Sequence, residues 1–276
     1  MKIFILICTL DEGILRIPDL LLPEQEGVYY VVSWQRTMGK NEQTALKERK
    51  DVRLVTMEGR GLCRNRNHAI ETALTWLDHP LEDAIFIIAD DDERLMPEAL
   101  DRLRDIYKRY PKMDGALVRL RSRVDEQYFK AYPPALIAYG RHPRSYYPCS
   151  WEMTFRTRVW QIGIRFDERF GLGSEMLCAG EEDVLLTDMM RKGLHILIVP
   201  EDLGYTDPVT TGSHILNPKM LRSKGAVYGY QHSLFVAWLR ILREALSLGW
   251  KQKVNPWPIL SEIISGVNYI RSCKKD

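Results

Sequence analysis

Short runs of almost entirely apolar residues recur through the first part of this chain, and each is about as long as a β-strand. They span residues 3–10, 28–33 and 84–89, with a shorter and weaker run at 52–56. The first run is rich in β-branched residues, which favour strands over helices. A strand that is apolar at every position suits a parallel sheet covered on both faces. The runs therefore predict a mostly parallel, buried sheet.

Amphipathic helical patterns lie between and after these runs. Residues 62–77 place apolar side chains on one helical face, and Pro97 opens a second such pattern, since proline is tolerated in the first helical turn. The apolar positions are Ile70, Ala73, Leu74 and Leu77 in the first pattern and Leu100, Leu103 and Ile106 in the second. Alternating strands and helices predict an α/β domain whose ligands bind at the carboxyl ends of the strands.

The later part of the chain extends this pattern and then changes character. We expect a strand at 116–120, a helix at 181–192 and another strand at 196–199. Beyond residue 216 the sequence becomes helical and amphipathic. The organisation predicted is an α/β domain over residues 1–215 followed by a C-terminal helical extension over residues 216–276.

The composition argues against several classes of protein. The chain has 276 residues, of which 45% are hydrophobic, enough for a normal globular core. Its net charge of +2 is too small to indicate nucleic acid as a partner. The five cysteines are scattered and form no C-x-x-C pair, which is typical of reduced thiols in a cytosolic protein.

The apolar segments do not predict a membrane span. Residues 3–10 are followed at once by Asp11 and Glu12 and lack a cleavage site, so we interpret them as a first strand rather than a signal peptide. The run at 234–242 is broken by Arg240, and no run is long enough to cross a bilayer. We expect a cytoplasmic protein, either free or bound peripherally at the inner face of the membrane.

Three consecutive aspartates, Asp90, Asp91 and Asp92, follow the run at 84–89 directly. Neighbouring carboxylates repel one another and lose hydration on burial, so their position after a buried strand needs a reason. Side chains alternate along an extended chain, which places Asp90 and Asp92 on the same side. Such a pair offers hard oxygen ligands for Mg²⁺ or Mn²⁺. The alternative is that Asp92 caps the next helix while the other two are solvated.

A basic helix start lies at residues 59–70. Arg64 and Arg66 fall in its first turn, where the helix dipole disfavours cations. They are explained if an anion docks there, because free backbone N–H groups and guanidinium groups together form a phosphate site. An ordinary basic surface turn is the alternative. RNA binding is disfavoured because the segment has no interleaved aromatic residues.

An acidic helix start follows Gly180, where Glu181, Glu182 and Asp183 precede an amphipathic helix. Acidic residues at a helix start are stabilised by the dipole alone, which is one sufficient explanation. The other is that one of them is a general base that takes a proton from an attacking hydroxyl group.

Together these segments resemble inverting glycosyltransferases of the GT-A fold, family 2, of the bacterial type. The resemblance covers roughly the first 215 residues and depends on the order and spacing of several short motifs. Residues 61–70, GLCRNRNHAI, resemble the family's helix start beside the nucleotide diphosphate. Residues 89–92, ADDD, resemble its metal-binding D-x-D motif. Residues 166–173, FDERFGLG, and 180–183, GEED, resemble the region that supplies the catalytic base and contacts the acceptor.

The resemblance implies a mostly parallel central sheet flanked by helices and a nucleotide-diphospho-sugar as donor. UDP is the favoured nucleotide, although the second strand ends in Trp34-Gln35 rather than the usual aspartate, which weakens the expectation of uracil recognition. The residues implied in donor binding are Thr9, Gln35, Arg64, Arg66, Asn67, Asp90 and Asp91.

The resemblance also implies a metal cofactor and a catalytic base. Mn²⁺ or Mg²⁺ would be held by Asp90 and Asp92 together with His214. The base would be Glu182 or Asp183, because the family's acidic pair can be aligned in either way. The base deprotonates an acceptor hydroxyl, which attacks the sugar with inversion.

The acceptor is the least determined part of this expectation. Trp151 and Glu152 are candidates for its pocket, because an aromatic face packs on a sugar ring. Core packing explains Trp151 equally well. A glycan or a lipid-linked acceptor, as in surface polysaccharide synthesis, is the class expected.

Two other functions are compatible with such a scaffold. A non-catalytic protein that binds a sugar nucleotide or a carbohydrate would not need carboxylates at both the metal and the base positions. A sugar-phosphate nucleotidyltransferase would need a glycine-rich, lysine-bearing phosphate loop near the N-terminus. Residues 9–16 contain only Gly13.

The helical extension combines a strongly apolar face with basic residues. The apolar positions are Leu234, Phe235, Trp238, Leu239, Leu242, Leu246 and Trp250, and the basic ones are Lys251, Lys253, Arg271, Lys274 and Lys275. This combination is typical of a helix that lies on an anionic membrane surface. Packing on the α/β domain, or on a second copy in a homodimer, explains the pattern equally well.

Overall fold

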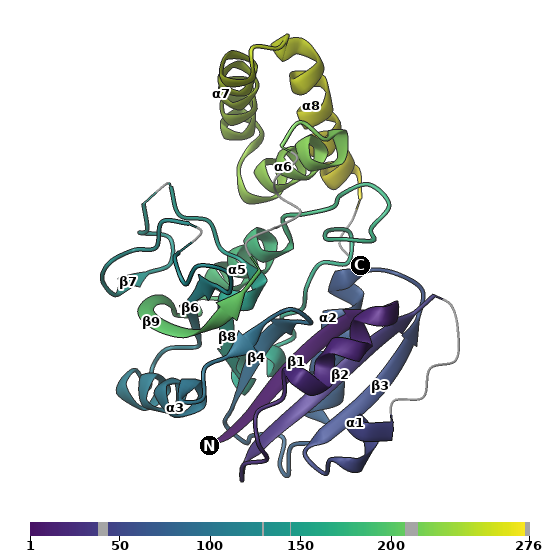
Figure 1. Ribbon diagram of the computed structural model, residues 1–276. Helices are drawn as coiled ribbons and strands as arrows, with labels where there is room; N and C mark the ends of the chain where they lie inside the picture. The colour runs from purple at the N-terminus through teal and green to yellow at the C-terminus, as the bar shows by residue number, and fades with distance from the viewer. Residues whose placement is uncertain (38–43, 129, 144, 208–214, 274–276) are drawn as a thin grey trace. The chain divides into compact units, whose positions relative to one another are not determined.

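The computed structural model describes residues 1–37, 44–128, 130–143, 145–207 and 215–273 (Figure 1). The chain divides into two compact units. The first contains residues 1–60, 64–165 and 188–208, and the second contains residues 61–63, 166–187 and 209–276. Segment 166–187 therefore belongs to the same unit as the C-terminal helices, whereas the sequence pattern placed it in the α/β domain over residues 1–215.

A mixed sheet forms the centre of the first unit (Figure 1). Its strands are β1 (Lys2–Leu10), β2 (Val28–Arg36), β3 (Val52–Glu58), β4 (Ala84–Asp90), β5 (Arg94–Leu95), β6 (Gly115–Ser122), β7 (Ile137–Ala138), β8 (Met153–Arg156) and β9 (Ile196–Thr206). They lie in the order β3-β2-β1-β4-β8-β6-β9-β5, with β7 beside β9. The pairs among β1 to β4 are parallel, as is β6 with β9, whereas β8 is antiparallel to both its neighbours. The predicted mostly parallel sheet is confirmed.

The strand registers explain why polar groups gather at one edge of this sheet. β1 and β4 are buried at almost every position, as their apolar runs predict. Cys8 of β1 lies opposite Asp90 of β4, and Thr9 lies opposite Trp34 of β2. The first polar residues after three apolar runs therefore share the carboxyl edge, which is where ligands bind in open α/β sheets.

Helices cover the sheet and complete the core of the first unit. They are α1 (Thr44–Glu48), α2 (Leu62–Leu74), α3 (Ala99–Arg109) and α4 (Thr157–Gln161), with 3₁₀ segments η1 (Asp11–Asp19) and η2 (Ser150–Glu152). α3 buries Leu100, Leu103 and Ile106, as their spacing predicts. The segment η1 was not expected from the sequence pattern, and it contributes buried Ile14 and Ile17 to the core.

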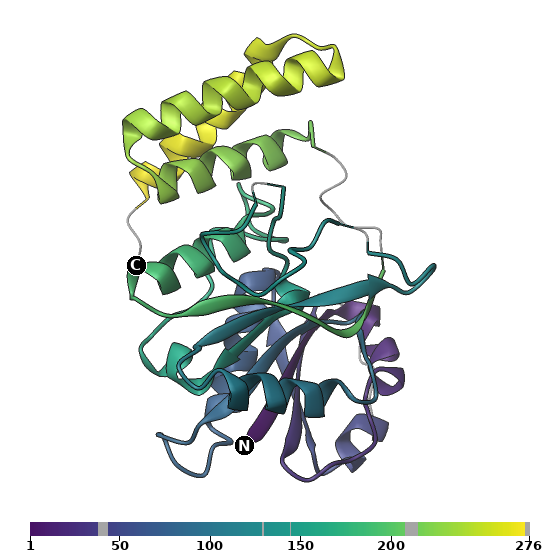
Figure 2. The same ribbon diagram turned by 90° about the vertical axis from the view of Figure 1, so that its left-hand side faces the viewer.

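The second unit is built on α6 (Pro218–Gln231), α7 (Leu234–Gln252) and α8 (Pro256–Ser272), which confirms the helical extension (Figure 2). α6 and α8 pack backbone to backbone. A Cβ atom on Gly225 would lie 1.9 Å from the carbonyl oxygen of Ile263, and one on Gly266 would lie 1.9 Å from that of Arg222. Only glycine allows this approach.

A second small core explains why segment 166–187 belongs to this unit. Phe170, Leu177 and Val184 pack against Val227 of α6 and Ile270 of α8. Val184 lies on α5 (Glu181–Arg191), which begins in the second unit and ends in the first. In the described part of the chain, no helix is both long enough and apolar enough to cross a membrane.

Candidate active site

The carboxyl edge of β1, β2 and β4 brings together most of the residues expected to bind a sugar nucleotide. Thr9 and Gln35 are buried at the ends of β1 and β2, and Asp90 ends β4. Asp91 and Asp92 follow in a turn and are partly exposed. The predicted clustering of these side chains at one edge of the sheet is therefore present.

Asp90 is held by an arginine from the start of α2. Nη2 of Arg66 donates a hydrogen bond to Oδ1 of Asp90 over 2.9 Å and another to Oγ of Ser150 over 2.7 Å. The Arg66 side chain is 1% exposed, whereas that of Asp90 is 26% exposed. We expected Arg66 to be available to bind a phosphate group. In the structure its guanidinium group is instead buried and paired with Asp90.

Asp91 is held by residues of β1 and η1. The Thr9 hydroxyl donates to Oδ2 of Asp91 over 2.5 Å, and Arg16 forms an ion pair with Oδ1. A Cβ atom on Gly13 would lie 2.1 Å from Oδ2 of Asp91 and 2.3 Å from Oγ1 of Thr9. The glycine lets η1 approach the acidic turn closely, and Arg16 is a site residue that the sequence pattern did not reveal.

Asp92 differs from its two neighbours in its electrostatic surroundings. No cation among the described residues forms an ion pair with it. Burial, followed by repulsion from Asp90 and Asp91, raises the pKa of Asp92 to about 6. Glu93 is buried, and burial together with the charge of Asp90 raises its pKa well above the ordinary value. The end of β4 therefore carries negative charge that a bound cation would stabilise.

The acidic turn can hold a divalent cation if water and substrate phosphate oxygens complete the coordination shell of the ion. Within the described ranges, no three His, Cys, Asp or Glu side chains converge as a ready-made metal cage. Mg²⁺ and similar ions often take only one or two protein carboxylates and complete their shell with water and substrate phosphate oxygens. Asp92, with Asp90 or Asp91, offers that partial set. His214, the third predicted ligand, lies outside the described residues.

The first turn of α2 also connects the ends of β1 and β2. Nδ2 of Asn65 donates to the carbonyl oxygens of Thr9 and Ser33, over 3.3 and 3.1 Å. Oγ of Ser33 lies 2.9 Å from Nδ1 of His68 on the same helix. Asn65 is a buried positioning residue that the helix-start motif contains but whose role only the fold reveals.

The remaining polar groups of this edge differ in their exposure. Arg64 is exposed and Asn67 is partly exposed, so both are accessible at the start of α2. Of the two arginines at this helix start, Arg64 is therefore the one that a phosphate group can reach from solution.

Trp34 is held at the end of β2. Its Nε1 donates to the carbonyl oxygen of Asp11 over 2.8 Å, and the Arg36 guanidinium lies 4.8 Å from its ring.

Glu152 does not fit its expected contact with an acceptor. Its side chain is fully buried, where it forms an ion pair with Lys130 and accepts hydrogen bonds from the hydroxyls of Tyr132 over 2.8 Å and Tyr146 over 2.7 Å. Lys130 also lies over the rings of both tyrosines. This network fixes η2, which carries Ser150, the partner of Arg66.

Trp151 is the other candidate for acceptor contact. Its side chain is partly buried and packs against the core of the first unit. That placement matches the core-packing alternative and leaves part of the ring accessible.

The two candidate bases lie in the first turn of α5. Glu182 and Asp183 are both partly exposed. Burial, followed by repulsion from Glu182, raises the pKa of Asp183 to about 7, against the opposing effect of a hydrogen bond with Gln231. Gly180 precedes them at φ +95°, and a Cβ atom there would lie 2.5 Å from Val227, so glycine is required at this helix start.

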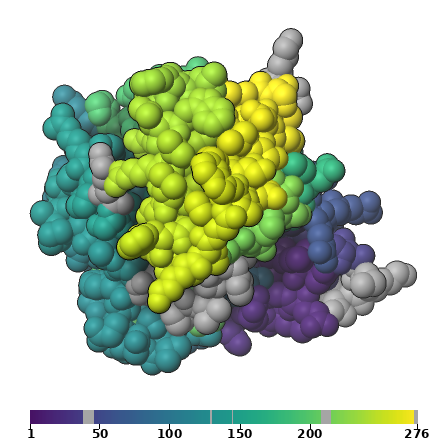
Figure 3. Space-filling model, turned by 90° about the horizontal axis from the view of Figure 1, so that it is seen from above, coloured from purple at the N-terminus to yellow at the C-terminus, as the bar shows by residue number. Residues whose placement is uncertain are grey.

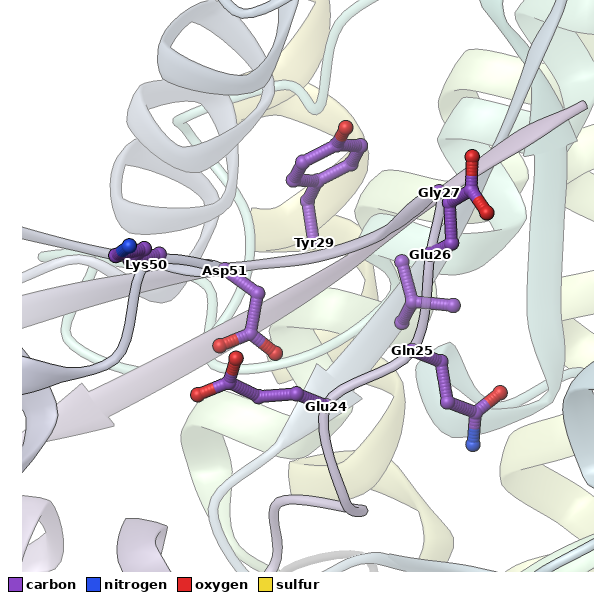
Figure 4. A pocket seen from close by; sticks show the side chains of 8 residues that line it. Glu24, Gln25, Glu26, Gly27, Tyr29, Lys50 and Asp51 are labelled. Carbon is purple, nitrogen blue, oxygen red and sulfur yellow. The ribbon is translucent and has the colours of Figure 1, made fainter.

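A pocket of about 320 Å³ lies elsewhere, at the amino ends of β2 and β3 (Figure 4). It is lined by Glu24, Gln25, Glu26, Gly27, Val28, Tyr29, Lys50 and Asp51. None of the predicted site residues lines it. The amino ends of these strands form the opposite edge of the sheet from the acidic turn, so the pocket is separate from the candidate active site.

Comparison with known proteins supports the fold. No family model matches the sequence, and no curated protein matches it. Among solved structures, residues 1–349 of Staphylococcus aureus TarS superpose with a TM-score of 0.60 over 97% of this chain and 81% of that chain, at 16% identity. The same TarS fragment in complex with UDP-GlcNAc gives 0.59 over 97% and 82%, at 15% identity, and in complex with UDP it gives 0.53 over 83% and 65%, at 14% identity. The likeness confirms the predicted fold.

Proposed function

We propose that this chain, whose fold is similar to that of TarS, is a glycosyltransferase that transfers a sugar from a nucleotide-diphospho-sugar to an acceptor hydroxyl. The observation that carries the proposal is the acidic turn Asp90–Asp92 at the carboxyl edge of β4, beside the ends of β1 and β2. A scaffold of the same fold, TarS, has been crystallised with UDP and with UDP-GlcNAc. A UDP-sugar is accordingly the proposed donor.

The donor's nucleotide is proposed to bind across the ends of β1 and β2. Thr9 and Gln35 lie there, and Asn65 ties both strand ends to α2. Arg64 is exposed at the start of α2 and is proposed to meet the diphosphate, because a guanidinium group and helix N–H groups together favour an anion. Arg66 contributes indirectly, by holding Asp90 in place.

Mn²⁺ or Mg²⁺ is the proposed cofactor, held by Asp92 with Asp90 or Asp91. When bound, such an ion stabilises the negative charge that develops on the leaving diphosphate. The protein places Asp92 in a half-buried position among other acidic side chains. Burial and repulsion from these side chains raise its pKa, and a bound cation would stabilise its charged form. Arg66, Thr9 and Arg16 keep the other two carboxylates in fixed orientations.

Glu182 or Asp183 is proposed to accept the proton of the acceptor hydroxyl. The hydroxyl oxygen forms a bond to the anomeric carbon while the bond from that carbon to the diphosphate oxygen breaks and its electron pair leaves with the diphosphate. The configuration at the anomeric carbon is thereby inverted. A base with a pKa near 7, as at Asp183, is deprotonated in about half of the molecules at neutral pH and is suited to this role.

The donor class can be tested on the purified full chain. A ligand that binds only the folded state raises the melting temperature, so a UDP-sugar should do so in the presence of Mn²⁺. Release of UDP, by transfer or by slow hydrolysis, should accompany binding. Binding without UDP release under any acceptor or metal condition would favour a non-catalytic sugar-nucleotide-binding protein, and release of pyrophosphate from a nucleoside triphosphate would favour a nucleotidyltransferase.

A further inference from the structure

The helix α7 has two apolar faces, of which only one is used by the fold. Ala237, Ile241, Ala245 and Leu248 are buried, and the last three pack in a common core with Ile263 of α8. These positions are three or four residues apart, so they form one helical face. That face packs α7 against the rest of the second unit.

The other apolar face of α7 is exposed along the whole helix. Its residues also follow each other at intervals of three or four, and their exposed fractions are 73% for Phe235, 56% for Leu239, 43% for Leu242, 49% for Leu246 and 87% for Trp250. Large exposed apolar side chains are common singly, but a continuous stripe of them marks an interaction surface. We call these five residues the apolar stripe.

Exposed apolar side chains continue beyond α7, in the connecting turn and in the first turn of α8. Val254 is 43% exposed and Trp257 is 64% exposed. Figure 3 shows the side chains of α7, in yellow-green, beside those of α8, in yellow. Tryptophan is enriched where an apolar phase meets water, because its ring is apolar and its N–H group can stay hydrated.

The charges beside the stripe are all of one sign at the surface. Arg240, Arg243, Lys251 and Lys253 are exposed. Among the described residues 233–258, the acidic side chain is Glu244, which is only 25% exposed and forms an ion pair with Lys224 of α6. Arg243 lies four residues after Leu239 and seven before Trp250, so it borders the stripe directly. The complementary partner is therefore both apolar and anionic.

From this combination we infer that α7 and the turn after it bind the surface of an anionic lipid bilayer. The helix lies in the plane of the interface, with the apolar stripe inserted among the acyl chains and the cations at the headgroups. α7 cannot cross the bilayer, because it carries Arg240, Arg243, Glu244 and Lys251 within its length. A second copy of the chain fits less well, since it would bring two cationic faces together.

Sedimentation of the full-length protein with lipid vesicles tests this inference. Binding to phosphatidylcholine vesicles that contain phosphatidylglycerol is expected, with weaker binding to phosphatidylcholine alone and a decrease as salt is raised. Phe235→Ser and Trp250→Ser should each weaken binding by about tenfold or more, because each removes a large side chain from the bilayer. Arg240→Gln and Arg243→Gln should each weaken it by about fivefold.

The matched control is Leu81→Ser, which removes a side chain that is 81% exposed in the first unit and should leave vesicle binding unchanged. The substituted side chains of the stripe are exposed, so the melting temperature should stay constant. Failure of the wild-type protein to bind either kind of vesicle would overturn the inference. So would self-association that Phe235→Ser abolishes in the absence of lipid binding, which would make the stripe a dimer interface.

Discussion

The guanidinium group of Arg66 lies 2.9 Å from the carboxylate of Asp90, with Arg66 almost completely buried and Asp90 reaching the surface. Two arginines two positions apart on one helix start thus have different roles. Arg66 faces inward and organises the acidic turn, whereas Arg64 faces solvent. This relationship separates the structural contribution of the helix start from its proposed contribution to donor binding.

Replacing Arg66 should therefore reduce stability. Arg66→Met removes the buried partner of Asp90 and Ser150, and breaking a buried ion pair typically costs about 3 kcal/mol or more. Urea unfolding monitored by circular dichroism measures the loss. The matched variant Arg64→Gln should change the free energy of unfolding by no more than about 0.5 kcal/mol, as is usual for exposed positions, while it weakens UDP-sugar binding. A stable Arg66→Met protein that loses only donor affinity would show that the assignment is reversed.

Replacing Glu152 should also act on stability rather than on acceptor use. Lys130→Met and Glu152→Gln each leave the other member of a fully buried ion pair without its charged partner, at a cost of about 3–5 kcal/mol. The double variant should recover part of this loss, because neither charge is then left alone. Unfolding curves for the four proteins form a double-mutant cycle that checks this. An unchanged stability combined with a raised KM for the acceptor would contradict this structural role and would support contact between Glu152 and the acceptor.

The pH dependence of the rate should distinguish the two candidate bases. Burial and Glu182 raise the pKa of Asp183 to about 7, and a base must be deprotonated to act. If Asp183 is the base, kcat rises as pH increases through about 7 and falls about tenfold per pH unit below it. Glu182→Gln removes a negative neighbour and should lower the pKa of Asp183, which shifts this limb to lower pH. Asp183→Asn should abolish the limb together with the activity.

The opposite pattern identifies Glu182 as the base. In that case Asp183→Asn would stay active, and Glu182→Gln would lose turnover at every pH. Both side chains lie on the partly exposed first turn of α5, so neither variant is expected to unfold the protein. Melting temperatures of the two variants serve as the control.

The sequence patterns predicted the parts of this structure that depend on local periodicity. The apolar runs place β1, β2 and β4 correctly, and parallel pairing then brings Thr9, Gln35 and Asp90 to one edge without further information. The spacing of Leu100, Leu103 and Ile106 likewise predicts the buried face of α3. Such features repeat over several residues, so a single chain shows them.

The remaining features depend on contacts between residues far apart in the sequence. Nothing near Glu152 indicates that Lys130 and Tyr132 will surround it, and nothing near Arg66 indicates that Ser150 will receive its hydrogen bond. The attachment of segment 166–187 to the C-terminal helices follows from the small core around Phe170, to which α6 and α8 contribute. The sequence therefore predicts where a charged residue of a motif lies in the fold, but it does not predict which residue will pair with it.

The acidic turn at the end of β4 is the centre of the account, and Asp92→Asn tests it most directly. UDP release from a UDP-sugar should require Mn²⁺ or Mg²⁺ and should fall at least about 100-fold in this variant, because a carboxylate that holds the cation beside the leaving group is lost. The melting temperature should not fall, since the change relieves repulsion from Asp90 and Asp91. Asp105→Asn, at an exposed position on α3, should behave like the wild-type protein. Equal UDP release by the Asp92→Asn and wild-type proteins, or full activity in the presence of a chelator, would contradict the proposed metal-assisted transfer.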